Sequence, residues 1–234
     1  MKRLMVIGGH SGDEAISVGG IVAKVVREGG YCVFVALTNG DGGHPVLNRT
    51  QYAPQKDAEA YAAAKILGAE CILWPVSSGH VAISPESEAK LATLIRTHKP
   101  DTIITHWRNS MHRDHVASYY NTVAAIGKAA SPVFEDGNEP FTVENLYFFD
   151  NWEDADDFKP QLYVSIQPED EAKWLEACKC FEFFRESFYD FDYQTYYTSL
   201  HQVRGAIAAR EGAPTKLANA LMLPPVTAYD PRIL

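Results

Sequence analysis

The stretch Leu4-Met5-Val6-Ile7-Gly8-Gly9-His10-Ser11-Gly12-Asp13-Glu14 decides how this chain folds. It passes from an uninterrupted apolar run, typical of a buried strand, through a short loop into the acidic start of a helix. A strand followed by a helix in this way is the first unit of a parallel sheet with crossover helices.

Further short apolar runs follow along the chain, with helical-period stretches between them. The pattern predicts an α/β fold with a mostly parallel sheet. We expect strands at residues 4–8, 32–37, 71–74, 102–105, 147–150 and 162–166, and helices at 14–28, 52–67, 86–97, 115–129, 168–184 and 194–210. No linker or repeat interrupts the sequence, so we expect one domain over residues 1–234.

The charge and the cysteines limit the classes of function. The chain has 30 Asp and Glu residues against 21 Lys and Arg, a net charge of -9, which argues against nucleic acid and favours a small ligand. No apolar stretch reaches membrane-spanning length, and the first is too short for a signal peptide. The four cysteines form no C-x-x-C pair, and we interpret them as reduced thiols of a cytoplasmic protein.

The loop after the first strand offers two metal ligands. Ligands of parallel sheets bind beyond the carboxyl ends of the strands, where His10 and Asp13 lie three residues apart. Zinc accepts imidazole nitrogen and carboxylate oxygen, and a catalytic site uses three protein ligands. Two alternatives stay open: Asp13 or Ser11 caps the helix, or the glycines contact a nucleotide, although the G-x-G-x-x-G spacing is not met.

A second polar loop follows the fourth strand. Within ten residues it contains three of the eight histidines and one aspartate: His106, His112, Asp114 and His115. The first and fourth strands can deliver side chains to one point, so His115 can complete a ligand set with His10 and Asp13. The alternative is a solvated loop whose histidines cap the following helix.

These motifs resemble those of the PIG-L, or LmbE-like, zinc-dependent N-deacetylases. His10-x-x-Asp13 is similar to the family motif H-P-D-D-E, and His112-Arg113-Asp114-His115 is similar to H-x-D-H. The loop Thr38-Asn39-Gly40-Asp41-Gly42 and the helix end Leu67-Gly68 also resemble family motifs in the same order. The resemblance implies a Rossmann-like, three-layer α/β/α fold and removal of an acetyl group from an N-acylated amino sugar or similar small amide.

The resemblance also implies roles for individual residues. It makes His10, Asp13 and His115 the ligands of Zn²⁺, although other divalent transition metals accept the same donors. His112 would stabilise or protonate the transition state, and Asp114 would be its neighbour or orienter. The metal would polarise the acyl carbonyl and activate water.

One position departs from the family in a way that bears on this chemistry. Gly12 stands where the family carries the aspartate that acts as general base, and Ser11 replaces the proline; a bacterial subgroup with H-x-G-D shares this variant. General bases contribute roughly 10²- to 10⁴-fold in rate. Asp41, on the loop after the second strand, is one candidate for the replacement base, and Glu14 and Asp114 are the others. A metal-binding protein that has lost hydrolysis is the competing hypothesis.

Other features have weaker links to function. Trp107 and Arg108 lie in the histidine loop and are expected to contact the substrate, although core anchoring and a solvated charge are the alternatives. The aromatic residues between 181 and 197 fit core packing better than a sugar-stacking wall or an oligomer interface. Near the C-terminus, Asn219 replaces the glutamate that the family usually has. We also expect a homo-oligomer.

Overall fold

A computed structural model describes residues 2–224 and confirms the α/β architecture. The strands are β1 Arg3–Gly8, β2 Tyr31–Ala36, β3 Glu70–Leu73, β4 Thr102–Thr105, β5 Asn145–Phe149, β6 Leu162–Ser165 and β7 Ala218–Met222. The α-helices are α1 Asp13–Arg27, α2 Arg49–Leu67, α3 Pro85–His98, α4 Arg113–Ala130, α5 Pro168–Cys178, α6 Glu182–Arg185 and α7 Tyr193–Arg210, with 3₁₀ turns η1 Trp152–Asp154 and η2 Phe188–Asp190.

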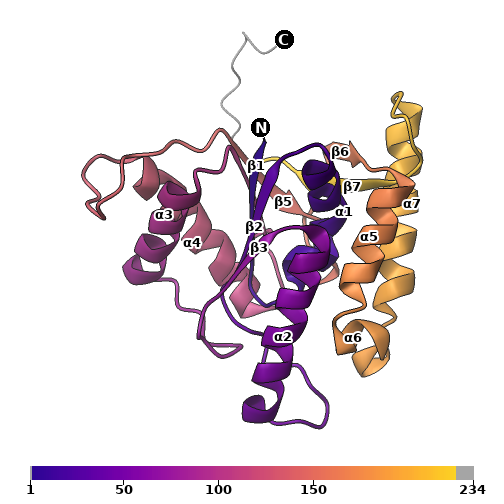
Figure 1. The fold of residues 1–234 in the computed structure, drawn as a ribbon, viewed down its shortest axis with the longest axis horizontal. Coiled ribbons are helices and arrows are strands. Elements are labelled where there is room, and N and C mark those ends of the chain that lie inside the picture. The colour runs from indigo at the N-terminus through magenta and orange to yellow at the C-terminus, as the bar shows by residue number, and fades with distance from the viewer. Residues whose placement is uncertain (1, 225–234) are drawn as a thin grey trace.

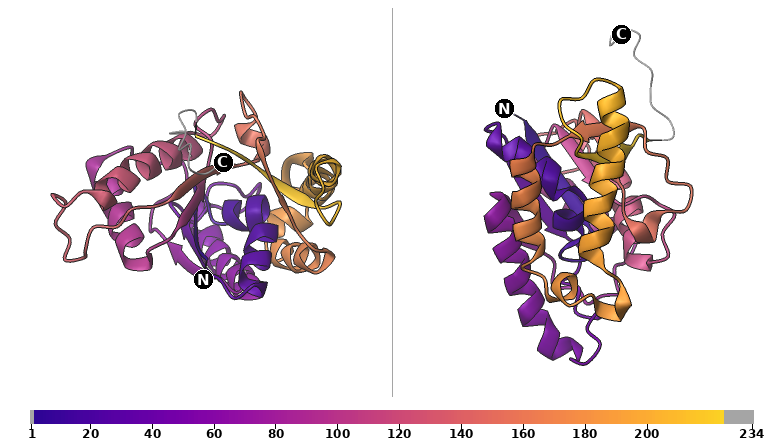
Figure 2. Two further views of the ribbon diagram at one scale, coloured as in Figure 1. Left: turned by 90° about the horizontal axis from the view of Figure 1, so that it is seen from above. Right: turned by 90° about the vertical axis from the view of Figure 1, so that its right-hand side faces the viewer.

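Within residues 2–224, seven strands form a mostly parallel sheet between two layers of helices. Its order is β3-β2-β1-β4-β5-β7-β6, and β7 alone runs antiparallel to its neighbours. Helices α1, α2, α5 and α7 lie on one side of the sheet and α3 and α4 on the other, as the ribbon shows (Figure 1) and the view from above confirms (Figure 2).

Helices cover both faces of strand β1, which explains why polar residues do not alternate with apolar ones in its sequence. Leu4 and Val6 belong to the core under α1 and α2, whereas Met5 and Ile7 belong to the core under α3 and α4. Successive strand residues point to opposite faces, so a strand covered on both faces needs apolar residues at every position.

The order of the strands determines where ligands can enter. From β1 the chain continues to β2 on one side, and it later returns to form β4 on the other side of β1. The order therefore reverses between β1 and β4, which is where open α/β sheets form a binding crevice beyond their carboxyl ends. The loops after β1, β4 and β5 all begin at this edge.

Two elements differ from the sequence prediction. The helix expected at residues 168–184 ends at Cys178, and the short helix α6 begins where Glu59 of α2 accepts a hydrogen bond from the backbone N–H of Glu182 at 3.1 Å. Strand β7 was not predicted; it inserts between β5 and β6. Asn219 lies in this strand, where its amide donates to the carbonyl oxygen of Ser17 at 3.0 Å.

Within residues 2–224, no helix is long and apolar enough to cross a membrane. All four cysteines are free thiols in the same part of the chain: Cys32 and Cys178 are buried, and Cys71 and Cys180 are partly buried.

Candidate metal centre and active site

Three side chains meet at the crevice between β1 and β4. The distances between His10 Nδ1 and Asp13 Oδ2 and between His115 Nε2 and Asp13 Oδ2 are both 3.4 Å, and His10 Nδ1 lies 3.2 Å from His115 Nε2. Tetrahedral donors bound about 2.0–2.1 Å from zinc lie about 3.3 Å apart. The triangle of two nitrogens and one oxygen thus has the dimensions of one face of such a site.

The turn between β1 and α1 brings this triangle together. The backbone N–H of His10 donates to Asp13 Oδ2 at 2.7 Å, which folds the turn onto the first residue of α1. A Cβ atom on Gly9 would lie 2.8 Å from the His115 ring, so only glycine lets α4 approach the loop this closely. Ser11 instead turns away and donates to the Asn39 carbonyl oxygen at 2.7 Å.

A buried carboxylate supports each of the two histidines of the triangle. Asp114 Oδ2 lies 3.2 Å from His10 Nε2 and also accepts the backbone N–H of Gly79. Asp154 Oδ1 lies 2.9 Å from His115 Nδ1. Such carboxylate–histidine pairs fix the ring orientation and direct the other nitrogen toward a metal.

His106 lies beside the triangle, but both nitrogens of its ring already have hydrogen-bond partners. Its Nδ1 lies 2.7 Å from Asp154 Oδ2, and its Nε2 accepts the backbone N–H of Gly9 at 2.9 Å. Although its Nε2 is also 3.1 Å from Asp13, that lone pair is occupied by Gly9. We therefore interpret His106 as a support that stacks on His115, with 3.7 Å between the ring centroids.

His112 lies on the open side of the triangle. It is the N-cap of α4, and its Nδ1 accepts the backbone N–H of Asp114 at 3.2 Å. Its ring centroid is 4.3 Å from that of His10. With Nδ1 accepting, the neutral ring carries its proton on Nε2. Burial, with the charge of His10 adding to it, lowers the pKa of His112 and favours this neutral form.

The charges of the site favour a cation at its centre. Burial lowers the pKa of His115 to about 4, so the ring is neutral as a metal ligand must be. Burial also opposes a charge on His10, but hydrogen bonds to Asp114 and Asp13 outweigh it and raise the pKa of His10 to about 9. A metal cation would compete with that proton for the same carboxylates.

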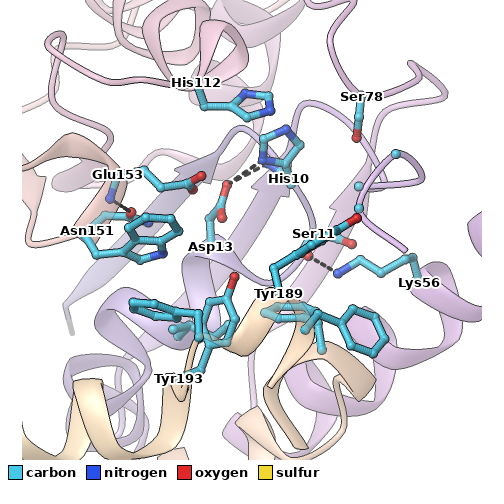
Figure 3. A pocket seen from close by; sticks show the side chains of 18 of the residues that line it. His10, Ser11, Asp13, Lys56, Ser78, His112, Asn151, Glu153, Tyr189 and Tyr193 are labelled. Carbon is cyan, nitrogen blue, oxygen red and sulfur yellow. Dashed lines mark hydrogen bonds and ion pairs between the residues drawn. The ribbon is translucent and has the colours of Figure 1, made fainter. Parts of the chain in front are cut away.

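The triangle opens into a cavity of about 690 Å³. Figure 3 shows His10, Asp13, His112 and Glu153 together on one side of it and Tyr189 and Tyr193 on the other. Further aromatic residues of the lining are Tyr52, Trp152, Phe183, Phe188, Phe191 and Tyr197. The aromatic segment before α7, for which core packing was the favoured interpretation, thus also forms a wall of the cavity.

Not every predicted site residue reaches the cavity. Asp41 is buried and its carboxylate is occupied by Arg49 Nη1 at 2.9 Å, the Ser78 N–H at 2.8 Å and the Ser77 hydroxyl. Trp107 is 3% exposed and donates to the Asp156 carbonyl oxygen, and Arg108 lies over its ring. In the described residues none of these three lines the cavity. The contacts with Arg49 and Ser78 hold Asp41 away from it, and the loop between β4 and α4 turns Trp107 into the core.

Sequence reasoning missed two acidic residues of the site. Glu153 lines the cavity, and Asp154 is fully buried behind His106 and His115. Both follow β5, which lies next to β4 in the sheet. The carboxyl-end rule could have identified them, because a strand at residues 147–150 was predicted and both acids follow it.

Two known proteins illustrate the sequences to which this chain is similar. A 1D-myo-inositol 2-acetamido-2-deoxy-alpha-D-glucopyranoside deacetylase of Rhodococcus erythropolis is 24% identical over 177 residues, which cover 63% of this chain but only 60% of that protein. A 4-oxalmesaconate hydratase of Pseudomonas putida is 23% identical over 241 residues, covering 99% of this chain and 91% of the hydratase.

A solved structure has the same fold over its whole length. The structure of GalB, the 4-carboxy-2-hydroxymuconate hydratase of Pseudomonas putida, matches with a TM-score of 0.86 and 21% identity, over 98% of this chain and 99% of that one. The family profile "PIG-L: GlcNAc-PI de-N-acetylase" matches residues 5–126, which is more than half of the 234 residues. The chain therefore belongs to the PIG-L family.

Proposed function

We propose that this chain is a metal-dependent hydrolase that removes an acyl group from an N-acylated amino sugar or a similar small amide. The observation that carries this proposal is the triangle of His10, Asp13 and His115, which opens onto a cavity. Zinc suits two nitrogens and one oxygen at these separations. When bound, the metal would polarise the acyl carbonyl and lower the pKa of water.

The surrounding side chains have defined tasks in this proposal. Asp114 and Asp154 hold the two histidine rings in position, since each carboxylate is buried and lies within 3.2 Å of a ring nitrogen. His112 lines the cavity, and its Nε2–H would donate to the oxygen of the acyl group as negative charge develops there.

The shape of the cavity supports a sugar-like substrate. Its volume of about 690 Å³ lies within the range of small-molecule sites. Trp152 and Tyr193 offer aromatic rings, against which the C–H face of a pyranose can pack, while Ser78 offers a polar group for its hydroxyls.

Metal content and amide hydrolysis, measured together, test the proposal. The metal-loaded parent should release a free amine from members of a panel of N-acetylated amino sugars. His115→Ala should lose the bound metal, measured by elemental analysis, and the hydrolysis with it. A parent that holds metal but releases no amine from any member of the panel would contradict the hydrolase proposal, and leave a metal-binding protein.

Hydration of an unsaturated carboxylic acid is a second candidate function. It is favoured by the similarity to the Pseudomonas putida hydratase, which spans nearly both chains, whereas the Rhodococcus deacetylase matches over part of its length. Arg49 and Lys56 line the cavity and would attract carboxylates. A conjugated dienoic dicarboxylate distinguishes the two functions, because hydration removes its ultraviolet absorbance without releasing an amine.

A further inference from the structure

One carboxylate on the cavity wall has no structural task. Glu153 lies in η1, directly after β5, and its side chain is 23% exposed. Its Oε2 lies 3.7 Å from His115 Nε2, one corner of the triangle. Among the described residues that line the cavity, Asp13 and Glu153 are the only two with carboxylates, and Asp13 belongs to the triangle.

The backbone holds Glu153 in place while its carboxylate stays available. Its N–H donates to Asn151 Oδ1 at 2.9 Å, and its carbonyl oxygen accepts the N–H of Met111 at 3.1 Å. The next residue, Asp154, is anchored to His106 and His115. Within residues 2–224, no hydrogen bond occupies the Glu153 carboxylate, whereas Asp41, Asp114 and Asp154 are each held by two or more donors.

The position that carries the acid in the family motif is closed in this chain. Gly12 is the N-cap of α1 with a φ of 115°, a conformation that side chains rarely adopt. A Cβ atom there would lie 3.3 Å from the Phe183 ring and 3.4 Å from the Phe181 ring. Lys56 Nζ lies 4.7 Å and 4.5 Å from the centroids of Phe181 and Phe183 and donates to the Ser11 carbonyl oxygen. The two rings and Lys56 thus fill the space beside Gly12.

We propose that Glu153 is the proton-transferring group of this site, in place of an acid at position 12. This inference rests on the proposed amide hydrolysis. Glu153 takes one proton from water as the water oxygen bonds to the acyl carbon. It then gives that proton to the amide nitrogen as the carbon–nitrogen bond breaks, so water and amide become a carboxylic acid and an amine. Figure 3 shows Glu153 directed toward the same region as His10 and Asp13.

The test compares Glu153→Gln with a matched control. Glu88→Gln is suitable because the Glu88 side chain is also 23% exposed, but it pairs with Lys128 between α3 and α4. Each zinc-loaded variant is measured for bound metal, for amine release and for affinity toward acetohydroxamic acid, a metal chelator that gives a proton to a neighbouring base.

We expect Glu153→Gln to keep its metal and to lose roughly 10²- to 10⁴-fold in kcat. Its affinity for acetohydroxamic acid should fall by about tenfold or more, because a charge-assisted hydrogen bond is lost. Glu88→Gln should match the parent in all three measurements.

Two results would overturn the assignment. Loss of metal from Glu153→Gln would make Glu153 a ligand, and unchanged hydroxamate affinity would show that it takes no proton at the site. A parent that hydrolyses no amide would count against the proposed function alone, since the hydroxamate measurement still decides the role of Glu153.

Discussion

Substitution of Asp154 by asparagine tests how the metal triangle is held. Asp154 is fully buried, and its two oxygens lie 2.7 Å from His106 Nδ1 and 2.9 Å from His115 Nδ1. An asparagine has the same size but offers only one oxygen, and its NH₂ group donates. One of the two imidazole N–H groups must therefore face a donor in Asp154→Asn.

The structure indicates the size of the effect. A metal-binding histidine is oriented by the group that is hydrogen-bonded to its other ring nitrogen. Loss of that group typically lowers metal affinity by about 10- to 100-fold, which corresponds to roughly 1.4 to 2.8 kcal/mol. We expect a loss near the upper end, because this one carboxylate orients His115 and also holds His106, which stacks on it. The free energy of unfolding should also fall by about 1–3 kcal/mol, since a buried donor loses its acceptor.

Competition with a chromophoric chelator measures the zinc affinity of parent and variant. Asp150→Asn is the matched control, because Asp150 is also a buried aspartate just after β5 but pairs with Arg204 Nη2 at 2.7 Å. The control should lose stability and keep its zinc affinity. If Asp154→Asn bound zinc as tightly as the parent, the carboxylate would not orient the ligand, and the reasoning would be refuted.

Two further predictions concern Gly12 and Lys56. Gly12→Asp should lower the free energy of unfolding by roughly 1–3 kcal/mol without accelerating hydrolysis, because the aspartate would be strained at this backbone angle and would contact Phe181 and Phe183. Urea unfolding measures the stability and amine release measures the hydrolysis. A variant as stable as the parent and faster in hydrolysis would contradict this prediction. Burial lowers the pKa of Lys56 in the folded protein to about 8, below its ordinary value of 10.5. Between these two pH values the unfolded chain binds more protons than the folded protein, so the free energy of unfolding of the parent rises with pH. Over this pH range the free energy of unfolding of the parent should rise by roughly 3 kcal/mol more than that of Lys56→Met. If the free energies of unfolding of the two proteins changed with pH in parallel, the prediction would be wrong.

Local patterns in the sequence were sufficient to predict the main fold and the meeting of three side chains. The apolar run of β1 needs burial on both faces, and this requirement is visible without any tertiary contact. The carboxyl-end rule then brings the loops after β1 and β4 together, which is why His10, Asp13 and His115 were predicted to meet.

Other parts of the structure depend on contacts between distant residues. Helix α5 ends early and α6 begins anew because Glu59, far away in the sequence, caps the new helix. Strand β7 takes its position between β5 and β6 from pairing with both. Neither feature has a local pattern strong enough to predict it.

The sequence by itself determined the fold class and the meeting of His10, Asp13 and His115, because strand burial and residue chemistry are properties of short segments. Only the tertiary structure decided which groups surround them. It closed the space at Gly12 with Phe181 and Phe183, turned Asp41 toward Arg49, and brought Glu153 and Asp154 to the site from β5. The physical reason is that a carboxylate is free, paired or buried according to neighbours that are distant along the chain.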